Sequence, residues 1–313
     1  MSNPRQVLEA SAASHQRGDS AVLAVVVDTE GSTYVRPGAM ALFAGREGQV
    51  GWLSGGCLEP EIEARALQTA ALMRIDAMEI DTRDDEDLMS GSALGCRGRL
   101  RLGLLPLAAM PGWPALVEAW RRRQGELRLS FDEGRLQAQA GQLRGEWRIE
   151  AAAMPPWRIE VSAPPAVIVF GAGPETPTLL PLLRQLGWMV TLVERRARWV
   201  SHVEHADHSL EASPEAAVRA FGDTRFDAAL VMNHNFELDR EALQSLSGNP
   251  IAFIGLLGPV RRREDLFRVL PAQTRDALSE RLHSPVGMPL GGQGPEAIAL
   301  SIAAQLQAYR FPR

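Results

Sequence analysis

The chain has 313 residues, which is enough for about two domains, and its 45% hydrophobic and 23% charged residues are typical of a soluble globular protein. Its formal net charge of −5 argues against a chain-wide basic surface for nucleic acid. All 33 of its basic side chains are arginines, which excludes mechanisms that need a lysine amine and favours forked binding of phosphate or carboxylate.

Cysteine content and hydropathy indicate the cellular compartment and the kinds of site that the protein can form. Two cysteines, Cys57 and Cys96, are too few for a disulfide framework or a four-cysteine zinc site. The first 20 residues lack the apolar core of a signal peptide, and the longest apolar run, 21–27, is far shorter than the ~20 residues that span a bilayer. We therefore expect a cytoplasmic protein with reduced thiols and no membrane partner.

The first 110 residues predict a compact α+β domain. The expected elements are a helix at 5–16, a buried strand at 21–27, a Gly- and Pro-rich loop at 29–38, a hairpin of 39–44 and 49–54, a helix from 58 to 70, a strand at 78–81, an acidic loop at 82–92 and a strand at 99–105. Residues 111–165 then predict a small β-rich connector with one helix and two alternating strands.

From residue 166 to residue 313 the pattern becomes strand, helix, strand, helix. The expected strands are 166–170, 189–194, 208–212, 227–232 and 252–257, and the expected helices are 175–186, 216–221, 238–246, 261–270 and 295–309. Alternation with short loops predicts a Rossmann-like, doubly wound parallel sheet, and its near-continuous apolar strands suit a sheet covered on both faces. The fold class is therefore α/β, with an N-terminal α+β domain.

The turn after the strand at 166–170 has the setting of a nucleotide-binding loop. Gly171 and Gly173 would let the backbone approach a pyrophosphate, and Glu194, 21 residues after Gly173, would bind a ribose hydroxyl. However, Pro174 supplies no N–H, and Glu175 would repel an incoming phosphate. A purely structural turn is the alternative, and NAD(P) binding is the weaker expectation.

Within the N-terminal domain, the segment LSGGCLEPE is the strongest candidate for a ligand-binding loop. Gly55 and Gly56 allow close backbone approach of a ligand, and Cys57 stands at the start of a helix, where cysteines gain thiolate character. Cys57 is therefore a candidate soft ligand or sulfur contact for a metal-bearing cofactor. The alternative is a small buried hydrophobic residue.

Three further segments present arginine or histidine from loops. Cys96 and Arg97 lie among other arginines, which favour a thiolate and attract anions, although an exposed strand edge is the alternative. Arg36 precedes a Pro-Gly turn and is either an anion-binding guanidinium or part of a plain surface loop. His234 follows the expected strand at 227–232, where it could donate to a ligand or shuttle a proton, and Arg261 at a helix start suggests a bound anion. A loop histidine and a solvated arginine are the alternatives for these two.

With these segments in order, the sequence resembles the xanthine dehydrogenase accessory protein family (XdhC/CoxI). The matching pieces span about residues 22–303 and are GSTYVRPGAMALF, GWLSGGCLEPEIE, LGCRGRLRL, VIVFGAG, LGWMVTLVERR, VMNHNFELD, FIGLLGPVRRR and LHSPVGMPLGGQGPEAIALSI. The resemblance implies an N-terminal domain carrying the GGC loop and a C-terminal Rossmann-like domain. The chain departs from the family pattern at Pro174-Glu175-Thr176, where the family often has HVG or HVA after GAG, and at Phe236, where it often has a second histidine.

The resemblance implies a chaperone for molybdenum cofactor, as bare molybdopterin or its dinucleotide form. Such a protein protects the cofactor while a cysteine desulfurase installs its terminal sulfur, and inserts it into an apo molybdenum hydroxylase of the xanthine dehydrogenase type. It implies a homodimer and a maturation factor rather than a catalyst. By motif, Cys57 becomes the cofactor-loop cysteine and Arg36 the loop arginine, Gly171 and Gly173 form the turn, and His234 follows the fourth Rossmann strand.

Two other functions remain open at this level. The first is an NAD(P)-dependent oxidoreductase that uses the C-terminal domain. The second is a thiol or sulfur-transfer factor that uses Cys57 and Cys96, which do not form a CxxC pair.

Overall fold

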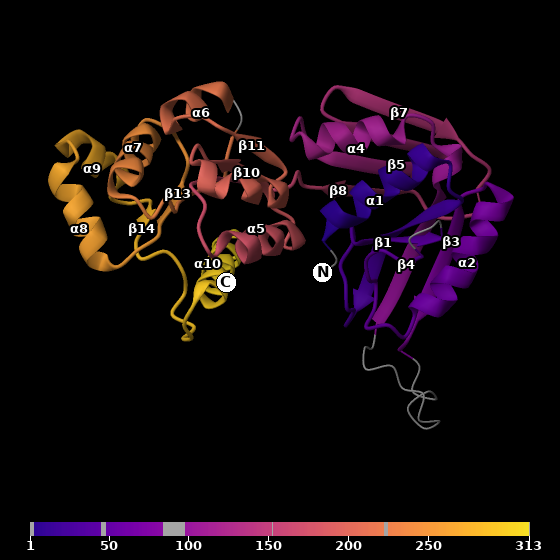
Figure 1. Cartoon of the computed structure of the whole chain (residues 1–313). Helices are drawn as coiled ribbons and strands as arrows, with labels where there is room; N and C mark the ends of the chain where they lie inside the picture. The colour runs from indigo at the N-terminus through magenta and orange to yellow at the C-terminus, as the bar shows by residue number, and fades with distance from the viewer. Residues whose placement is uncertain (1–2, 45–47, 84–97, 152, 222–224, 313) are drawn as a thin grey trace. The chain divides into compact units, whose positions relative to one another are not determined.

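The computed structural model describes residues 3–44, 48–83, 98–151, 153–221 and 225–312, and the chain forms two compact units, Met1–Pro164 and Pro165–Arg313 (Figure 1). The elements of the first unit are α1 (Pro4–Arg17), β1 (Ala21–Gly31), β2 (Met40–Ala44), α2 (Glu59–Leu72), β3 (Asp76–Asp81), β4 (Gly98–Pro106), the 3-10 helix η1 (Leu107–Ala109), α4 (Trp113–Arg121), β5 (Leu127–Asp132), β6 (Arg135–Ala140), β7 (Leu143–Arg148) and β8 (Trp157–Val161). They build two antiparallel sheets with the strand orders β2-β1-β4-β3 and β7-β6-β5-β8.

The uninterrupted apolar run of β1 arises because both faces of its sheet are buried. Val22, Ala24 and Val26 pack into a core that includes Ile62 of α2. Side chains on the other face of β1, such as Leu23, enter a second core shared with α1, α4 and the β7-β6-β5-β8 sheet. The segment expected as a β-rich connector therefore folds onto the N-terminal sheet, and its strands β5 and β7 are joined by β6 and β8, which the sequence did not indicate.

The expected hairpin of 39–44 and 49–54 is only half present. Residues 40–44 form β2, but the second arm is reduced to a single bridge between Leu42 and Val50. The backbone leaves the sheet at Gly51, which has φ +89° and lies so close to α1 that an added Cβ would be 2.7 Å from Val7. Extended pairing stops there because the turn toward the GGC loop begins.

The second unit confirms the predicted Rossmann-like sheet. Its elements are β9 (Ala166–Phe170), α5 (Thr176–Gln185), β10 (Met189–Val193), the 3-10 helix η2 (Ala197–His205), β11 (His208–Leu210), α6 (Pro214–Phe221), β12 (Ala228–Val231), α7 (Phe236–Ser247), β13 (Phe253–Leu256), α8 (Val260–Val269), α9 (Ala272–Leu278), β14 (Leu282–His283) and α10 (Pro295–Arg310). The strand order is β11-β10-β9-β12-β13-β14, and every pairing is parallel. The fold is α/β with an α+β first unit, as the sequence predicted.

Alternate residues of β9 point to opposite faces of this sheet. Val167 and Val169 pack against α5 and α10, whereas Ile168 and Phe170 pack against α7, α8 and α9. The chain reverses its direction of sheet growth between β9 and β12, so the loops after these two strands flank the topological switch point. Gly171 and His234 lie in these two loops.

Candidate functional site

The motif segments of the first unit lie around one small pocket. Its volume is about 40 Å³, and its walls come from the loop after β1, the loop before α2 and the facing ends of β3 and β4: Ser32, Thr33, Tyr34, Leu53, Ser54, Gly55, Cys57, Leu58, Ile80, Thr82, Gly98 and Leu100. The STYVRPG and GGC segments are separated by some 20 residues in sequence but share this wall. The fold therefore joins two of the segments that the sequence singled out.

The GGC loop presents its thiol at the surface. Cys57 is exposed, stands two residues before the first residue of α2, and has its Sγ 3.7 Å from the hydroxyl oxygen of Ser54. Gly56 has φ +103°, a conformation that other residues rarely adopt, and a Cβ added at Gly55 would meet open space. The loop thus combines a reachable sulfur with bare backbone, and the predicted alternative of a buried cysteine does not apply.

A buried glutamate holds this loop in shape. The Glu59 side chain accepts hydrogen bonds from the backbone N–H of Leu53 (3.0 Å) and Ser54 (2.8 Å) and from the Ser54 hydroxyl. The same hydroxyl oxygen accepts from the N–H of Gly56 and Leu58, each at 3.1 Å. Glu59 is only 3% exposed, so its carboxylate organises the loop and does not face solvent.

Hydrogen bonding outweighs burial in its effect on the pKa of the Glu59 carboxyl. Burial raises the pKa of its carboxyl, but the bonds from Ser54 and from the Leu53 backbone together bring it below the ordinary glutamate value. Ser54 and Glu59 hold the loop together, and the sequence did not single out either residue. The available signal was an acidic residue in the first turn of a helix that begins three residues after a glycine pair.

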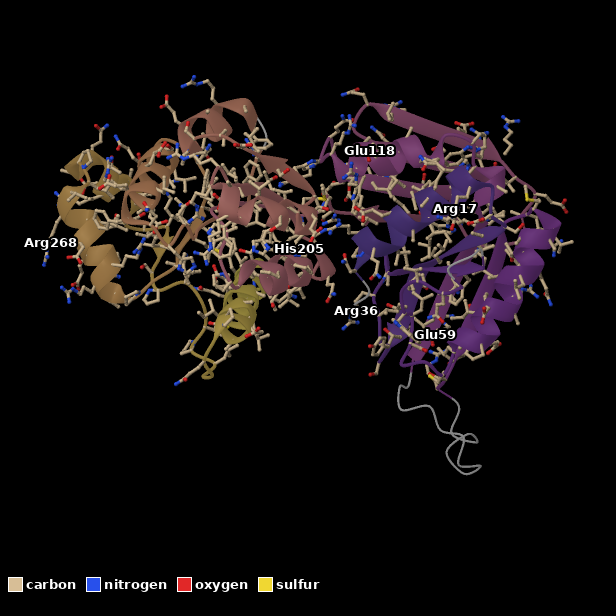
Figure 2. All side chains as sticks on the ribbon, in the orientation of Figure 1. Arg17, Arg36, Glu59, Glu118, His205 and Arg268 are labelled. Atoms are coloured by element: carbon tan, nitrogen blue, oxygen red, sulfur yellow. The ribbon has the colours of Figure 1, made fainter. Side chains whose placement is uncertain are left out.

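Three arginines lie on the segments that reach this pocket, although none of them is among the residues that line it, and they differ in how they are paired. Arg36 is exposed on the loop after β1 (Figure 2) and has no carboxylate partner in the part of the chain that the structure describes. Arg99 and Arg101 lie on one face of β4 and pair with Glu30 (2.8 Å) and Glu79 (3.0 Å). Arg36 is therefore the guanidinium of these three that is available to an anion. The predicted residues Cys96 and Arg97 lie outside the described residues.

The glycines of the turn after β9 are required by the neighbouring loop. Gly171 has φ +88°, and a Cβ there would collide with Asn233, while one on Gly173 would be 2.6 Å from Nε2 of His234. Both clashes come from the loop after β12. Packing across the switch point thus accounts for these two glycines before any ligand is considered.

Glu194 is fully engaged by its own chain. It directly follows β10 and is 4% exposed. One carboxylate oxygen accepts from the backbone N–H (2.7 Å) and Nε (2.9 Å) of Arg196. The other accepts from the Ala172 N–H (2.7 Å) and from Nη2 of Arg196 (2.6 Å). Burial raises the pKa of this carboxyl, but the Arg196 and Ala172 bonds lower it below the ordinary value. A ribose hydroxyl would have to compete with four existing donors.

Glu175 and His234 form a pair directly beside the glycine turn. Glu175, 1% exposed at the start of α5, lies 3.0 Å through Oε1 from Nε2 of His234, whose backbone has φ +52°. A negative charge therefore already occupies the positive end of α5. The Gly173 N–H donates to the Thr176 hydroxyl (2.8 Å), so residues 172 and 173 have both committed their N–H groups to the protein.

A second buried carboxylate supports the His234 loop. Asp239, 1% exposed on α7, accepts from the backbone N–H (3.1 Å) and side-chain amide (3.0 Å) of Asn233 and from Nε of Arg262 (2.9 Å). Nε and Nη2 of Arg262 are thereby engaged by Asp239. Its neighbour Arg261 is 88% exposed and lies 3.8 Å from Asp265. The sequence did not indicate that Asp239 and Arg196 bind neighbouring loops, because these contacts depend on how separate loops meet.

We expect the Glu175–His234 pair to be visible by NMR titration. The bond with Glu175 raises the pKa of His234 above its ordinary value, against the effect of burial. The pairing therefore contributes stability below the ordinary histidine range, and this contribution is lost as the pH rises through the raised pKa. Replacing Glu175 with glutamine should lower the measured pKa of His234.

His283 provides the internal control for this titration. Its pKa is lowered by burial in the same unit, and Glu175→Gln should leave it unchanged. A His234 pKa that is equal in both proteins would contradict the pairing.

Metal clusters and membrane-spanning helices are both absent from the residues that the structure describes. These residues contain no group of three or more His, Cys, Asp or Glu side chains that could hold a metal ion. They also include no helix that is long and apolar enough to cross a membrane. Metal contact by Cys57 alone stays a prediction.

Two family models match this chain. One, described as the XdhC Rossmann domain, matches residues 167–306, and the other, described as the XdhC and CoxI family, matches residues 14–76. Together the two matches cover more than half of the chain, and each falls in one of the two units.

Individual relatives agree with these matches. A Bacillus subtilis (strain 168) protein that is named as a probable xanthine dehydrogenase subunit is 26% identical over 322 residues, covering 92% of each chain. The Escherichia coli (strain K12) protein YqeB is 38% identical over 92 residues, which are 29% of this chain and 17% of that one. A crystal structure described as a xanthine dehydrogenase from Bacillus halodurans has a TM-score of 0.80 at 26% identity and covers 100% of this chain and 97% of its own.

Proposed function

The chain belongs to the XdhC and CoxI family, and from this membership we propose that it matures a xanthine dehydrogenase-type enzyme by binding molybdenum cofactor and passing it to the apo-enzyme. Family membership supports the maturation role and the association with such an enzyme. In this proposal the protein works in the cytoplasm as a homodimeric chaperone, and a cysteine desulfurase sulfurates the cofactor while it is held.

The observation that carries the proposal is the meeting of the STYVRPG and GGC segments at the pocket of the first unit. Molybdenum cofactor combines a soft metal–sulfur centre with a phosphate. Cys57 supplies an exposed sulfur, Gly55 leaves its backbone open, and Arg36 carries a guanidinium that has no carboxylate partner among the described residues. This donor set fits one soft contact and one forked phosphate contact.

In this role the residues of the first unit would bind the cofactor and orient the thiol of Cys57 toward it. Glu59 and Ser54 fix the backbone from Leu53 to Leu58, so Cys57 is presented without reorganisation of the loop. The pocket is small, about 40 Å³, so it would receive one edge of a ligand and leave the rest at the surface. Contact through an edge suits a carrier, because release requires few interactions to be broken.

An NAD(P)-dependent oxidoreductase is the main rival. The Rossmann sheet favours it, but the N–H groups of Ala172 and Gly173 and both oxygens of Glu194 already have partners within the chain. Glu175 adds a negative charge where a pyrophosphate would lie. NADH titration followed by fluorescence separates the two functions, since micromolar binding would favour the oxidoreductase.

Cofactor retention tests the proposal. Protein purified from a molybdenum-replete host should retain molybdenum and a pterin, measured by elemental and fluorescence analysis. Cys57→Ala and Arg36→Ala should each lower retention about tenfold, because a charge-assisted or soft-metal contact is lost in each. Arg148→Ala, at an exposed arginine on β7 of the same unit, is the matched control and should retain the wild-type amount.

Two results would contradict the proposed site. One is retention that does not change in Cys57→Ala and Arg36→Ala. The other is full activation of apo-enzyme in an extract that lacks this protein. A sulfur-transfer mechanism through both thiols predicts a third pattern, in which Cys57→Ala and Cys96→Ala each abolish sulfuration while the cofactor is still retained.

A further inference from the structure

Two exposed aromatic side chains belong to the segments that meet at the Cys57 pocket. Tyr34 is 54% exposed and Trp52 is 53% exposed, whereas the other six of the chain's seven tryptophans are buried or half-buried. An indole that remains half in water leaves a large apolar surface uncovered, and aromatic rings in such positions are typical of binding surfaces. The packing of the first unit does not explain why these two rings face solvent.

Both rings adjoin the residues around the exposed thiol. Tyr34 and Cys57 line the same pocket. Trp52 is not a lining residue, but a Cβ added to Gly56 would be 3.8 Å from Cζ3 of its indole, so the ring lies against the residue that precedes Cys57. The thiol therefore has one aromatic neighbour on the STYVRPG segment and another on its own loop.

The lining of this pocket is uncharged within the described part of the chain. It presents hydroxyl and aliphatic groups and no Asp, Glu, Arg or His side chain. Ser32 and Tyr34 hold their hydroxyls at the exposed side of this wall. Such a surface suits a conjugated heterocycle, because the face of the heterocycle can stack on an aromatic ring while its edge forms hydrogen bonds with hydroxyls.

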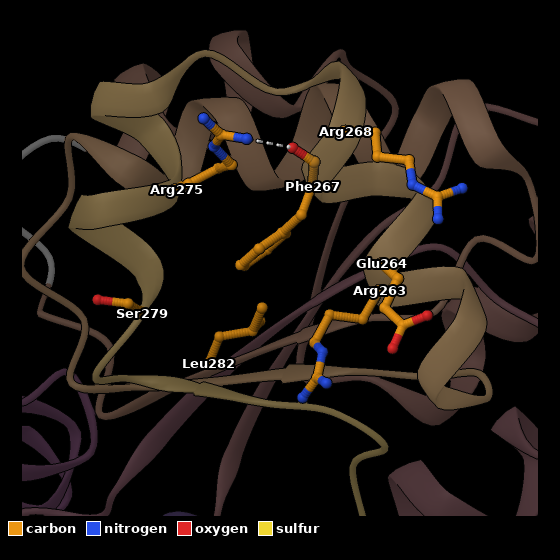
Figure 3. A pocket seen from close by; sticks show the side chains of 7 residues that line it. All are labelled: Arg263, Glu264, Phe267, Arg268, Arg275, Ser279 and Leu282. Atoms are coloured by element: carbon orange, nitrogen blue, oxygen red, sulfur yellow. Dashed lines mark hydrogen bonds between the residues drawn. The ribbon is translucent and has the colours of Figure 1, made fainter.

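A larger pocket in the second unit has a different character. It lies between α8 and α9, has a volume of about 520 Å³, and carries four charged groups among its seven lining residues: Arg263, Glu264, Arg268 and Arg275 (Figure 3). An uncharged ring placed there would have to displace water from charges of both signs, which is costly. Of these two pockets, the one beside Cys57 is therefore the one that suits an uncharged ring.

We infer that Tyr34 and Trp52 are stacking surfaces for the pterin of the cofactor, and that they hold its metal-bearing end toward Cys57. This inference rests on the proposed function and adds the residues that recognise the ring. The pterin is bonded to the carbons that carry the dithiolene sulfurs, so ring and metal are adjacent in the cofactor. The two aromatic residues and Cys57 are adjacent in the same way around the loop. Stacking selects the planar pyrimidinone half of the pterin, which a metal ion or a phosphate lacks.

Equilibrium dialysis with 6-carboxypterin, a pterin without metal, tests this inference on full-length protein from a host that makes no molybdopterin. The wild type should bind the probe saturably, and Tyr34→Leu and Trp52→Leu should each weaken binding about tenfold, because each loses an aromatic face but stays apolar. Tyr34→Phe and Trp52→Phe should bind within about threefold of the wild type, since a ring is kept. Cys57→Ala should bind the probe normally, because the probe offers no metal to the thiol.

The alkylation rate of Cys57 gives a second measurement. Iodoacetamide labelling, followed by mass spectrometry of the Cys57 peptide, should be slowed by saturating 6-carboxypterin in the wild type but not in Trp52→Leu. Phe311→Leu, at a ring that is 49% exposed in the second unit, is the matched control and should behave like the wild type in both measurements.

Three results would overturn the inference while circular dichroism shows the variants folded. They are a wild type that does not bind 6-carboxypterin saturably, leucine variants that both bind it normally, and phenylalanine variants that lose binding as fully as the leucine variants. Leucine variants that bind the pterin normally but fail to activate apo-enzyme would instead identify the rings as a protein contact. Failure of the proposed function is seen separately, as wild-type protein from a molybdenum-replete host that retains no cofactor.

Discussion

Replacing Glu59 with alanine should lower the free energy of unfolding by about 2–4 kcal/mol. The backbone N–H groups of Leu53 and Ser54 and the Ser54 hydroxyl would lose their common acceptor, and leaving a buried donor unpaired costs about 1–3 kcal/mol. Urea denaturation of the full chain measures the change. Because this network also shapes the GGC loop, the variant should alkylate at Cys57 at an altered rate and retain less molybdenum.

Glu61 offers the matched control. It is exposed in the first turn of the same helix, so Glu61→Ala changes the same helix-terminal charge without removing any buried acceptor. We expect its effect on unfolding to stay within about 0.5 kcal/mol. Equal effects of the two substitutions would show that Glu59 acts only through the helix terminus.

The stability that Glu59 provides should also depend on pH. Its pKa is lower in the folded protein than in the unfolded chain, so the contribution is present above the ordinary glutamate pKa and is lost as the pH falls through the lowered value. The difference in unfolding free energy between wild type and Glu59→Ala should therefore shrink in acid. If the difference in unfolding free energy between the two proteins stayed constant as the pH was lowered, the lowered pKa of Glu59 would be contradicted.

The pattern of apolar residues predicted the layered architecture, because each position of a strand that faces a core must carry an apolar side chain. The runs at 21–27 and 166–170 are apolar throughout, and β1 and β9 prove to be buried on both faces. In contrast, β14 has only two residues, Leu282 and His283, and is too short to give a periodic signal. Its place in the sheet is set by pairing with β13, which is a tertiary contact.

Some residues of the candidate sites could be recognised from the sequence, whereas their hydrogen-bond partners could not. Cys57 and its two glycines were recognisable because their types are unusual together before a helix. Glu194 was also recognised, but the sequence could not tell that Arg196 and the Ala172 N–H would occupy its carboxylate. Such partners depend on how loops close, and local patterns do not encode that closure.

Replacing Glu194 with alanine should destabilise the second unit by about 3 kcal/mol. The substitution removes a nearly fully buried carboxylate, leaving the Ala172 N–H and three N–H groups of Arg196 without their acceptor. Removing one partner of a buried ion pair costs about 3–5 kcal/mol, and the partial exposure of Arg196 places the effect at the lower end. Thermal and urea denaturation measure it.

Arg195 is the control for this substitution, because it is the adjacent arginine and pairs at 2.6 Å with Glu241 at a partly exposed position. Arg195→Ala should change the unfolding free energy by less than about 1 kcal/mol. Arg196→Ala should resemble Glu194→Ala, since the two side chains belong to one network.

The same variants show whether Glu194, beside the turn after β9, has a structural role or binds a ribose. If Glu194 serves the fold, wild type and Glu194→Ala should both fail to bind NADH in the micromolar range, while only the variant is less stable. If Glu194 instead holds a ribose, the wild type should bind NADH and the variant should lose that binding with little change in stability. The existing bonds from Ala172 and Arg196, together with the charge of Glu175, lead us to expect the first result.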